Sequence, residues 1–242
     1  MNRFTSHFSQ PKLIAIFLSA VFLFAANSSW AQGKAHFSLG AKLDFSTWKG
    51  NNQNGASFED KSSMLGLEAK VQHAKWFGGL TLSGGKFEFD TTAPTRLTNP
   101  LAASSEPVSI KRGEVDLILG YRVWPRIALF IDIKNVTNEW SIDGYKVEYT
   151  GIGFGISGHR PVSPEWTLFG NFGVVPMNIK ADGNDVGDAV RTALNAGFLY
   201  RINHRMNLSI GLQNQFQTDD YDNGSEQTHE IGSLTIGINA AL

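Results

Sequence analysis

The chain contains 242 residues, no cysteine, and 21 basic against 22 acidic side chains, which gives a formal net charge of −1 at pH 7. The absence of cysteine excludes a disulfide framework, a CxxC redox pair and a thiolate metal site. A near-neutral chain without a basic face argues against nucleic acid as a partner. The length suits one domain, and no low-complexity stretch follows Ala31.

Residues 1–31 have the pattern of a cleaved secretory signal. Arg3 and Lys12 give a positive start, the apolar run 13–26 follows, and small residues at 29 and 31 predict cleavage after Ala31. A membrane-anchoring helix is the weaker interpretation, because the run of 14 residues is shorter than the ~20 residues that a spanning helix needs. Cleavage would leave residues 32–242 as one barrel domain, with a net charge of −3 once Arg3 and Lys12 are removed.

The rest of the chain alternates apolar and polar residues with a period of two, and helical periodicity is almost absent. Between 115 and 123 the odd-numbered residues are apolar, whereas the even-numbered ones include Asp116, Gly120 and Arg122. The pattern predicts an all-β chain with ten strands, or with eight as the alternative. The ten predicted strands are 36–48, 63–72, 76–89, 109–123, 127–136, 145–158, 166–177, 189–202, 206–217 and 229–242.

The connections between these strands fall into two classes that alternate along the chain. The short turns are 73–75, 124–126, 159–165 and 203–205, and the long polar loops are 49–62, 90–108, 137–144, 178–188 and 218–228. Neighbouring strands joined in this way predict an antiparallel up-and-down barrel, with all tight turns and both ends of the mature chain at one side. Short periplasmic turns and long extracellular loops are typical of bacterial outer-membrane barrels.

Such a barrel is either soluble with an apolar interior or membrane-embedded with an apolar exterior, and alternation alone does not separate the two. Tryptophans recur at strand ends, where an indole can place its apolar body in lipid and its N–H in water. They predict an aromatic girdle at both membrane interfaces, and ordinary core aromatics are the alternative. The predicted girdle is Trp48, Trp76, Trp124, Trp140 and Trp166.

The polar face of the strands carries charges of both signs, which can pair with one another in a narrow lumen. If the turn 124–126 pairs residue 123 with 127, Asp116 lies opposite Lys134, and an opposite-charge cross-strand pair is stabilising. A solvated outer face with incidental pairing is the alternative. The predicted lumen-lining charged residues are Lys42, Asp44, Glu68, Lys70, Glu114, Asp116, Arg122, Asp132, Lys134 and Arg201.

The chain resembles small Gram-negative outer-membrane β-barrel proteins of the opacity-protein-like kind. The resemblance covers residues 32–242 as a pattern, with KRGEVDLILGYRV at 111–123 and SLTIGINAAL at 233–242 as examples. It implies export across the inner membrane, periplasmic chaperones and insertion by the outer-membrane assembly machinery. We expect outer-membrane lipid and lipopolysaccharide as partners, and a monomer by default. Such proteins usually end in an aromatic residue, whereas this chain ends in Leu242.

The segment Gly153–Gly158 matches the G-x-G-x-x-G pattern of dinucleotide-binding loops. Such a loop must open a helix, and the following His-Arg-Pro-Val-Ser-Pro cannot begin one. The alternation instead predicts a strand whose glycines face the lumen and make room for larger neighbours. Ile152, Phe154 and Ile156 would then face outward.

Catalytic and metal-binding signals are weak. His229 is the one candidate catalytic residue, since we expect it at the outer rim beside Glu230 and near the acidic loop 218–228. The acidic loops 178–188 and 218–228 lack the calcium-loop spacing, and we expect them to be solvated. The sequence predicts no cofactor and no metal site. We expect that the protein is not an enzyme.

The sequence therefore favours a structural or surface-interaction barrel, or a narrow pore. The alternatives are an outer-membrane hydrolase, omptin-like or lipid-modifying, with a site at the rim, and a soluble periplasmic barrel that binds an apolar ligand.

Overall fold

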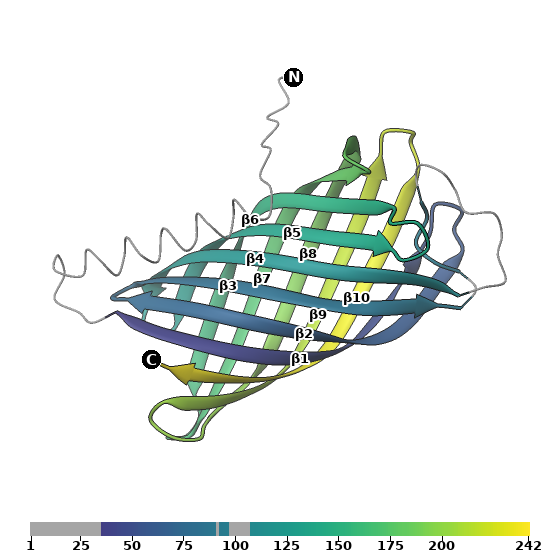
Figure 1. Cartoon of the computed structure of the whole chain (residues 1–242). Helices are drawn as coiled ribbons and strands as arrows, with labels where there is room; N and C mark the ends of the chain where they lie inside the picture. The colour runs from purple at the N-terminus through teal and green to yellow at the C-terminus, as the bar shows by residue number, and fades with distance from the viewer. Residues whose placement is uncertain (1–34, 91, 97–106) are drawn as a thin grey trace.

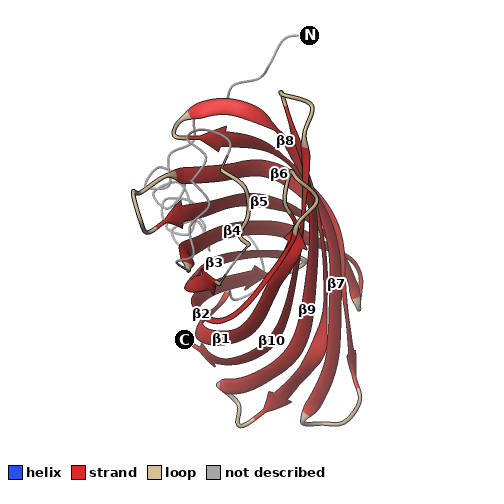
Figure 2. Cartoon of the chain, turned by 90° about the vertical axis from the view of Figure 1, so that its right-hand side faces the viewer, coloured by secondary structure: helices blue, strands red, loops and turns tan. Residues whose placement is uncertain are grey.

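The computed structural model describes residues 35–90, 92–96 and 107–242, so the predicted signal 1–31 lies outside the described residues. Ten antiparallel strands close into a barrel in the order in which they follow one another, with β1 paired to β10 (Figures 1 and 2). The strands are β1 His36–Asn51, β2 Ser57–His73, β3 Trp76–Phe89, β4 Val108–Trp124, β5 Ile127–Trp140, β6 Lys146–Pro161, β7 Trp166–Ala181, β8 Asn184–Arg201, β9 Met206–Tyr221 and β10 Glu226–Ala241. The predicted ten-stranded up-and-down barrel is confirmed. A search of the described residues for helices found none whose length and apolar character would let it cross a bilayer.

The two kinds of connection lie at opposite ends of the barrel, as predicted. The start of β1 and the end of β10 lie together at the short-turn end (Figure 1). The other end differs from the prediction, because most of its expected long loops are strand. The segment 178–188, for example, continues β7 to Ala181, turns at Asp182 and Gly183 with positive φ of 47° and 84°, and returns as β8. Of the connections at this end, 90–107 alone spans more than five residues.

The strands extend beyond the predicted boundaries because the inward side chains of the added residues pack or form hydrogen bonds inside the barrel. Ile179, Ala181 and Ala189 belong to an apolar cluster inside the barrel, and Asp219 is fully buried rather than solvated in a loop. Each added pair of residues also completes main-chain hydrogen bonds between neighbouring strands. The expectation that 178–188 and 218–228 are solvated loops is therefore wrong.

The outward face of the barrel is apolar, whereas the inward face carries buried charges beside an apolar and aromatic cluster. Leu65 is 63% exposed and Phe154 is 69% exposed, whereas Glu114 and Lys134 on the inward face are buried. This polarity is the reverse of that of a soluble barrel, which hides its apolar face from water. It is inconsistent with the alternative of a soluble barrel that binds an apolar ligand.

Gly151, Gly153 and Gly155 of β6 face the lumen as predicted. Ile152, Phe154 and Ile156 point outward. Larger neighbours on β7 and β5 occupy the space that the glycines leave. A Cβ on Gly153 would lie 2.1 Å from the Val174 main-chain oxygen, and a Cβ on Gly155 would lie 2.3 Å from Phe130 Cζ. The glycine pattern thus serves close strand packing, not cofactor binding.

Candidate functional site

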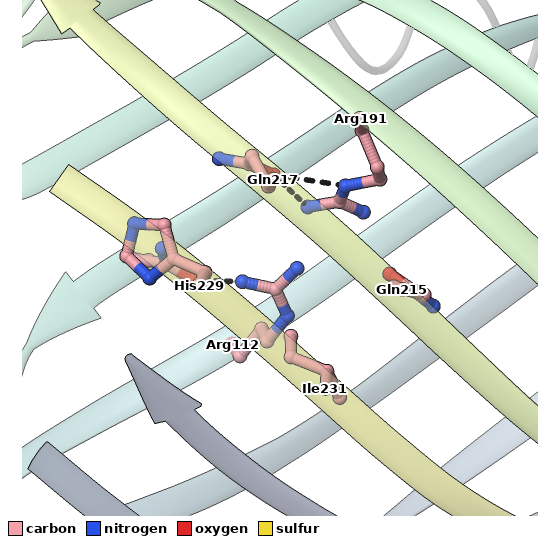
Figure 3. A pocket seen from close by; sticks show the side chains of 7 residues that line it. Arg112, Arg191, Gln215, Gln217, His229 and Ile231 are labelled. Atoms are coloured by element: carbon pink, nitrogen blue, oxygen red, sulfur yellow. Dashed lines mark hydrogen bonds between the residues drawn. The ribbon is translucent and has the colours of Figure 1, made fainter. Parts of the chain in front are cut away.

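A layer of buried charges crosses the middle of the lumen. Arg112 on β4 donates a hydrogen bond to Glu114 with 2.8 Å between Nε and Oε1, and a second one of 2.9 Å from Nη1 to Asn138 Oδ1 on β5. Arg191 on β8 reaches the same carboxylate, with 3.6 Å between its Nη1 and Glu114 Oε1. Strands β4 and β8 are separated by three others in the closed sheet, so these contacts span the lumen. Figure 3 shows the side chains of Arg112 and Arg191 from these two strands.

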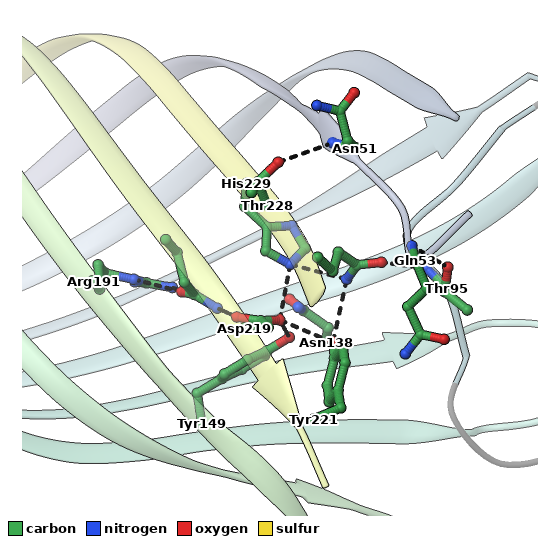
Figure 4. A network of polar contacts seen from close by, with 12 residues as sticks. Asn51, Gln53, Thr95, Asn138, Tyr149, Arg191, Asp219, Tyr221, Thr228 and His229 are labelled. Carbon is green, nitrogen blue, oxygen red and sulfur yellow. Dashed lines mark hydrogen bonds and ion pairs between the residues drawn. The ribbon is translucent and has the colours of Figure 1, made fainter. Parts of the chain in front are cut away.

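The layer continues across the barrel through side-chain amides and a carboxylate. Arg191 donates two hydrogen bonds to Gln217 Oε1, of 2.8 Å from Nε and 2.6 Å from Nη2. Gln217 in turn donates through Nε2 to Asp219 Oδ1 at 2.7 Å. The hydroxyls of Tyr149 and Tyr221 donate to Asp219 Oδ2 at 2.8 and 3.0 Å (Figure 4). A buried carboxylate is costly unless it is hydrogen-bonded, and Asp219 meets that requirement with donors from β6 and β9.

His229 on β10 joins this network to Gln227, with 3.0 Å between their Nε2 atoms, and both of its ring nitrogens are engaged. Trp48 Nε1 lies 3.1 Å from Nδ1, and an indole N–H can only donate, so Nδ1 is an acceptor and carries no proton. Nε2 then carries the proton of the neutral ring and donates it to Asp219 Oδ2 at 3.0 Å. A general base needs a free ring nitrogen within reach of its substrate, and neither nitrogen of His229 is free in this geometry.

An aromatic cluster fills the lumen between the charged layer and the long-connection end. Trp48 lies at its centre, with edge contacts to Phe87 and Phe89 at ring-centroid distances of 5.1 and 5.4 Å. The guanidinium of Arg112 lies 5.0 Å from the Trp48 ring, so that the cluster and the charged layer are in direct contact. Aromatic pairs in edge geometry add stabilisation beyond the area that they bury.

A short segment of the β3–β4 connection lies over this cluster. We call residues 92–96 the strap; its residues Pro94 and Arg96 are buried. Arg96 Nη2 lies 2.6 Å from Asp143 Oδ2, and its guanidinium lies 4.4 Å from the Tyr145 ring. Thr95 donates its main-chain N–H to Gln227 Oε1 at 2.7 Å. The hydrogen bond from Arg96, with a smaller contribution from the Tyr145 N–H, lowers the pKa of Asp143.

All ten predicted lumen charges lie at inward-facing positions of their strands. Four are buried, namely Asp44, Glu114, Asp132 and Lys134. Asp116 and Lys134 form the predicted cross-strand ion pair, in the predicted register. The remaining positions, towards the short-turn end, are more exposed, and Lys70 and Arg201 are open to solvent.

The predicted tryptophan girdle is wrong at two positions. Trp48 and Trp140 are 0% and 2% exposed, because they lie at inward-facing positions within the aromatic cluster. Trp76, Trp124 and Trp166 point outward at the short-turn end. An even or odd position relative to the neighbouring lumen residues would have separated Trp48 and Trp140 from Trp76 and Trp166. Trp124 has the parity of the lumen residue Arg122, and the register shift between these two residues turns it outward.

Sequence reasoning missed the residues that connect the network across the barrel. Arg112 and Arg191 share the inward alternation of Glu114 and Ala189, and that alternation was the available signal. Tyr149 and Gln217 share the inward alternation of their own strands as well, but alternation does not record which side chains meet across the lumen. Asp219 lies in the predicted loop 218–228, where no alternation was available.

No family model matches the chain, and no curated protein matches it in sequence. Solved structures of similar fold include outer-membrane barrels. The outer membrane protease OmpT from Escherichia coli has a TM-score of 0.50 and 12% identity, over 86% of this chain and 96% of that one. The translocator domain of the autotransporter NalP from Neisseria meningitidis has a TM-score of 0.46 and 9% identity, over 96% of this chain and 98% of that one. Neisserial surface protein A has a TM-score of 0.36 and 11% identity, over 86% and 98%. At these identities the likeness concerns the fold: the chain has the fold of small outer-membrane β-barrels.

Proposed function

We propose that the chain is an integral outer-membrane β-barrel with a closed lumen, whose role is structural or surface-interacting and which neither conducts nor catalyses. The observation that carries the proposal is the buried contact of Glu114 on β4 with Arg191 on β8, beneath the aromatic cluster around Trp48. Small barrels have room for little more than their own side chains, and here those side chains bond to one another across the lumen.

The membrane location rests on the outward apolar face and on the resemblance to outer-membrane barrels. The short-turn end faces the periplasm in this proposal, and the opposite end, where the strap lies, faces the outside. Export by the signal 1–31, insertion by the assembly machinery, a monomeric state, and contact with lipid and lipopolysaccharide belong to the same proposal.

Planar-bilayer conductance tests the closed lumen. We expect the refolded wild-type barrel to give no steady openings, because the charged layer and the aromatic cluster leave no continuous water path. Discrete steady openings that change on substituting Asp116 or Lys134 would contradict the proposal and favour the narrow pore instead. Heat-modifiable gel migration of the same sample shows that the barrel is folded and inserted.

A separate assay addresses the absence of catalysis. We expect His229→Ala to leave any peptidase or lipid-ester hydrolase activity of the preparation unchanged, because both ring nitrogens of His229 are engaged within the network. An activity that is present in the wild type and lost in this variant, with the barrel still folded, would favour the rim hydrolase.

A further inference from the structure

A groove of about 430 Å³ opens on the outer wall near the long-connection end, where β9, β10, β1 and β2 lie side by side. Among the residues that line the groove, Gly50 has no side chain, and the side chains of Phe58 and His229 are buried inside the barrel. The volume is in the range of small-ligand sites in proteins, which run from about 300 to 1,000 Å³.

Four outward side chains form one row across the groove in direct cross-strand register. Phe216 pairs with Glu230, Glu230 pairs with Lys49, and Lys49 pairs with Glu59. Lys49 Nζ lies 3.2 Å from Glu230 Oε2, so a donor and an acceptor are held together at the centre of the row. Phe216 is 50% exposed at one end, where it presents a ring to the groove.

A second row of polar side chains lies two residues farther along the strands, nearer the long-connection end. Thr228 pairs with Asn51, and Asn51 pairs with Ser57. The Ser57 hydroxyl donates to Asn51 Oδ1 at 2.9 Å. Thr228 Oγ1 accepts from the Asn51 main-chain N–H at 3.3 Å (Figure 4). These bonds fix the side chains at the edge of the groove.

The groove lies just beyond the outward apolar face. In the same strands Leu212 pairs with Leu234 and Leu234 pairs with Phe45, which is an apolar row that begins four residues before Lys49. Four residues of a tilted strand correspond to about 10 Å along the barrel axis. If Phe45 and its neighbours face the hydrocarbon, the groove is at the level of the lipid headgroups.

The chemistry of the row suits a saccharide better than a phosphate. Two carboxylates flank one lysine that is already paired, so the groove has no excess positive charge to attract an anion. Carboxylate, hydroxyl and amide groups can accept and donate hydrogen bonds to sugar hydroxyls, and an exposed ring can cover the apolar face of a sugar. Since the side chains point outward from the wall, a ligand approaches from the membrane plane.

We propose that this groove binds the sugar headgroup of an outer-leaflet glycolipid. Phe216 covers one face of the sugar ring, and Glu230, Lys49 and Asn51 bond to its hydroxyls. The proposal rests on the membrane location proposed above but not on the closed lumen, so a conducting barrel would leave it untouched.

Native mass spectrometry of the detergent-solubilised barrel tests the proposal. The added lipids are a neutral glucosyl-diacylglycerol, rough-type lipopolysaccharide, phosphatidylglycerol and phosphatidylcholine. We expect one molecule of either glycolipid to be retained in preference to both phospholipids, and Phe216→Ala or Glu230→Ala to weaken that retention about tenfold. Equal retention of phosphatidylglycerol, or unchanged retention in both variants, would overturn the proposal.

Two controls separate the groove from other effects. Phe154→Ala removes an outward aromatic ring from β6, 69% exposed and far around the barrel from β10, and should leave glycolipid retention unchanged. An excess of free glucose should not displace the glucosyl-diacylglycerol, because the acyl chains hold the sugar at the wall. Displacement by the free sugar would contradict a lipid source. A sample without heat-modifiable migration is discarded, which separates loss of the membrane barrel from loss of the site.

Discussion

Glu114 and Arg191 meet across the lumen, with 3.6 Å between Oε1 and Nη1, although they come from β4 and β8. Glu114 also accepts from Arg112, and Arg191 also donates to Gln217, so this contact joins two halves of one network. The barrel wall is held by neighbouring strands, whereas this network ties strands that do not touch in the sheet.

Removing Arg191 should destabilise the barrel strongly. Arg191→Ala leaves Gln217 without its donor and Glu114 with one cationic partner fewer, and breaking a buried ion pair costs about 3 to 5 kcal/mol. The free energy of unfolding, from urea titration of the barrel refolded into lipid vesicles, should fall by about that amount. Arg201→Ala is the matched control: this side chain is open to solvent, and a change of under about 0.5 kcal/mol is expected. Equal effects of the two variants would contradict the role given to the network.

Brominated lipids should distinguish the two groups of tryptophans. In single-tryptophan variants, Trp124 and Trp76 point outward and should be quenched by bromine near the headgroups, whereas Trp48 and Trp140 are inside the barrel and should not be. Quenching requires contact, so the readout reports the face on which each ring lies. Quenching of Trp48 comparable to that of Trp124 would show that it faces lipid after all.

A side chain at Gly153 should disturb the β6–β7 pairing. Gly153→Ala places a Cβ 2.1 Å from the Val174 main-chain oxygen, which cannot move without shifting the strand, and such overpacking costs about 1 to 3 kcal/mol. Gly113→Ala meets no heavy atom within 4 Å and should leave the free energy of unfolding unchanged or raise it by up to about 1 kcal/mol. The comparison uses the same urea titration, and a benign Gly153→Ala would refute the close packing.

Acid should release the strap. The pKa of Asp143 is lowered by the hydrogen bond from Arg96, so the contact stabilises the strap above the ordinary pKa of an aspartate, about 3.9, and is lost as pH falls through the lower folded value. Hydrogen exchange of the Thr95 and Arg96 amides should therefore rise on acidification below pH ~4. In the Asp143→Asn variant, exchange of these amides should already be fast at neutral pH and should not rise further on acidification. A rise of the same size in that variant would show that another group causes the change.

The sequence by itself determined the wall of this barrel. A period of two selects one face of each strand, and polar turn residues mark where the chain reverses, so strand number, strand order and the outward position of Phe154 followed from local pattern alone. The pairing of Asp116 with Lys134 also followed, because a tight turn fixes the register of the two strands that it joins.

Only the tertiary structure decided what fills the lumen. The sequence pattern predicts Asp219 in a loop and Trp48 at the rim, but both side chains are buried. Tyr149 and His229 contact Asp219, and Phe87 contacts Trp48, in each case from another strand. Which inward side chains meet depends on how the closed sheet curves, and no local pattern records that. The outer groove has the same origin: Phe216 and Lys49 lie 167 positions apart in the sequence, and the closure of β1 on β10 puts them in one row.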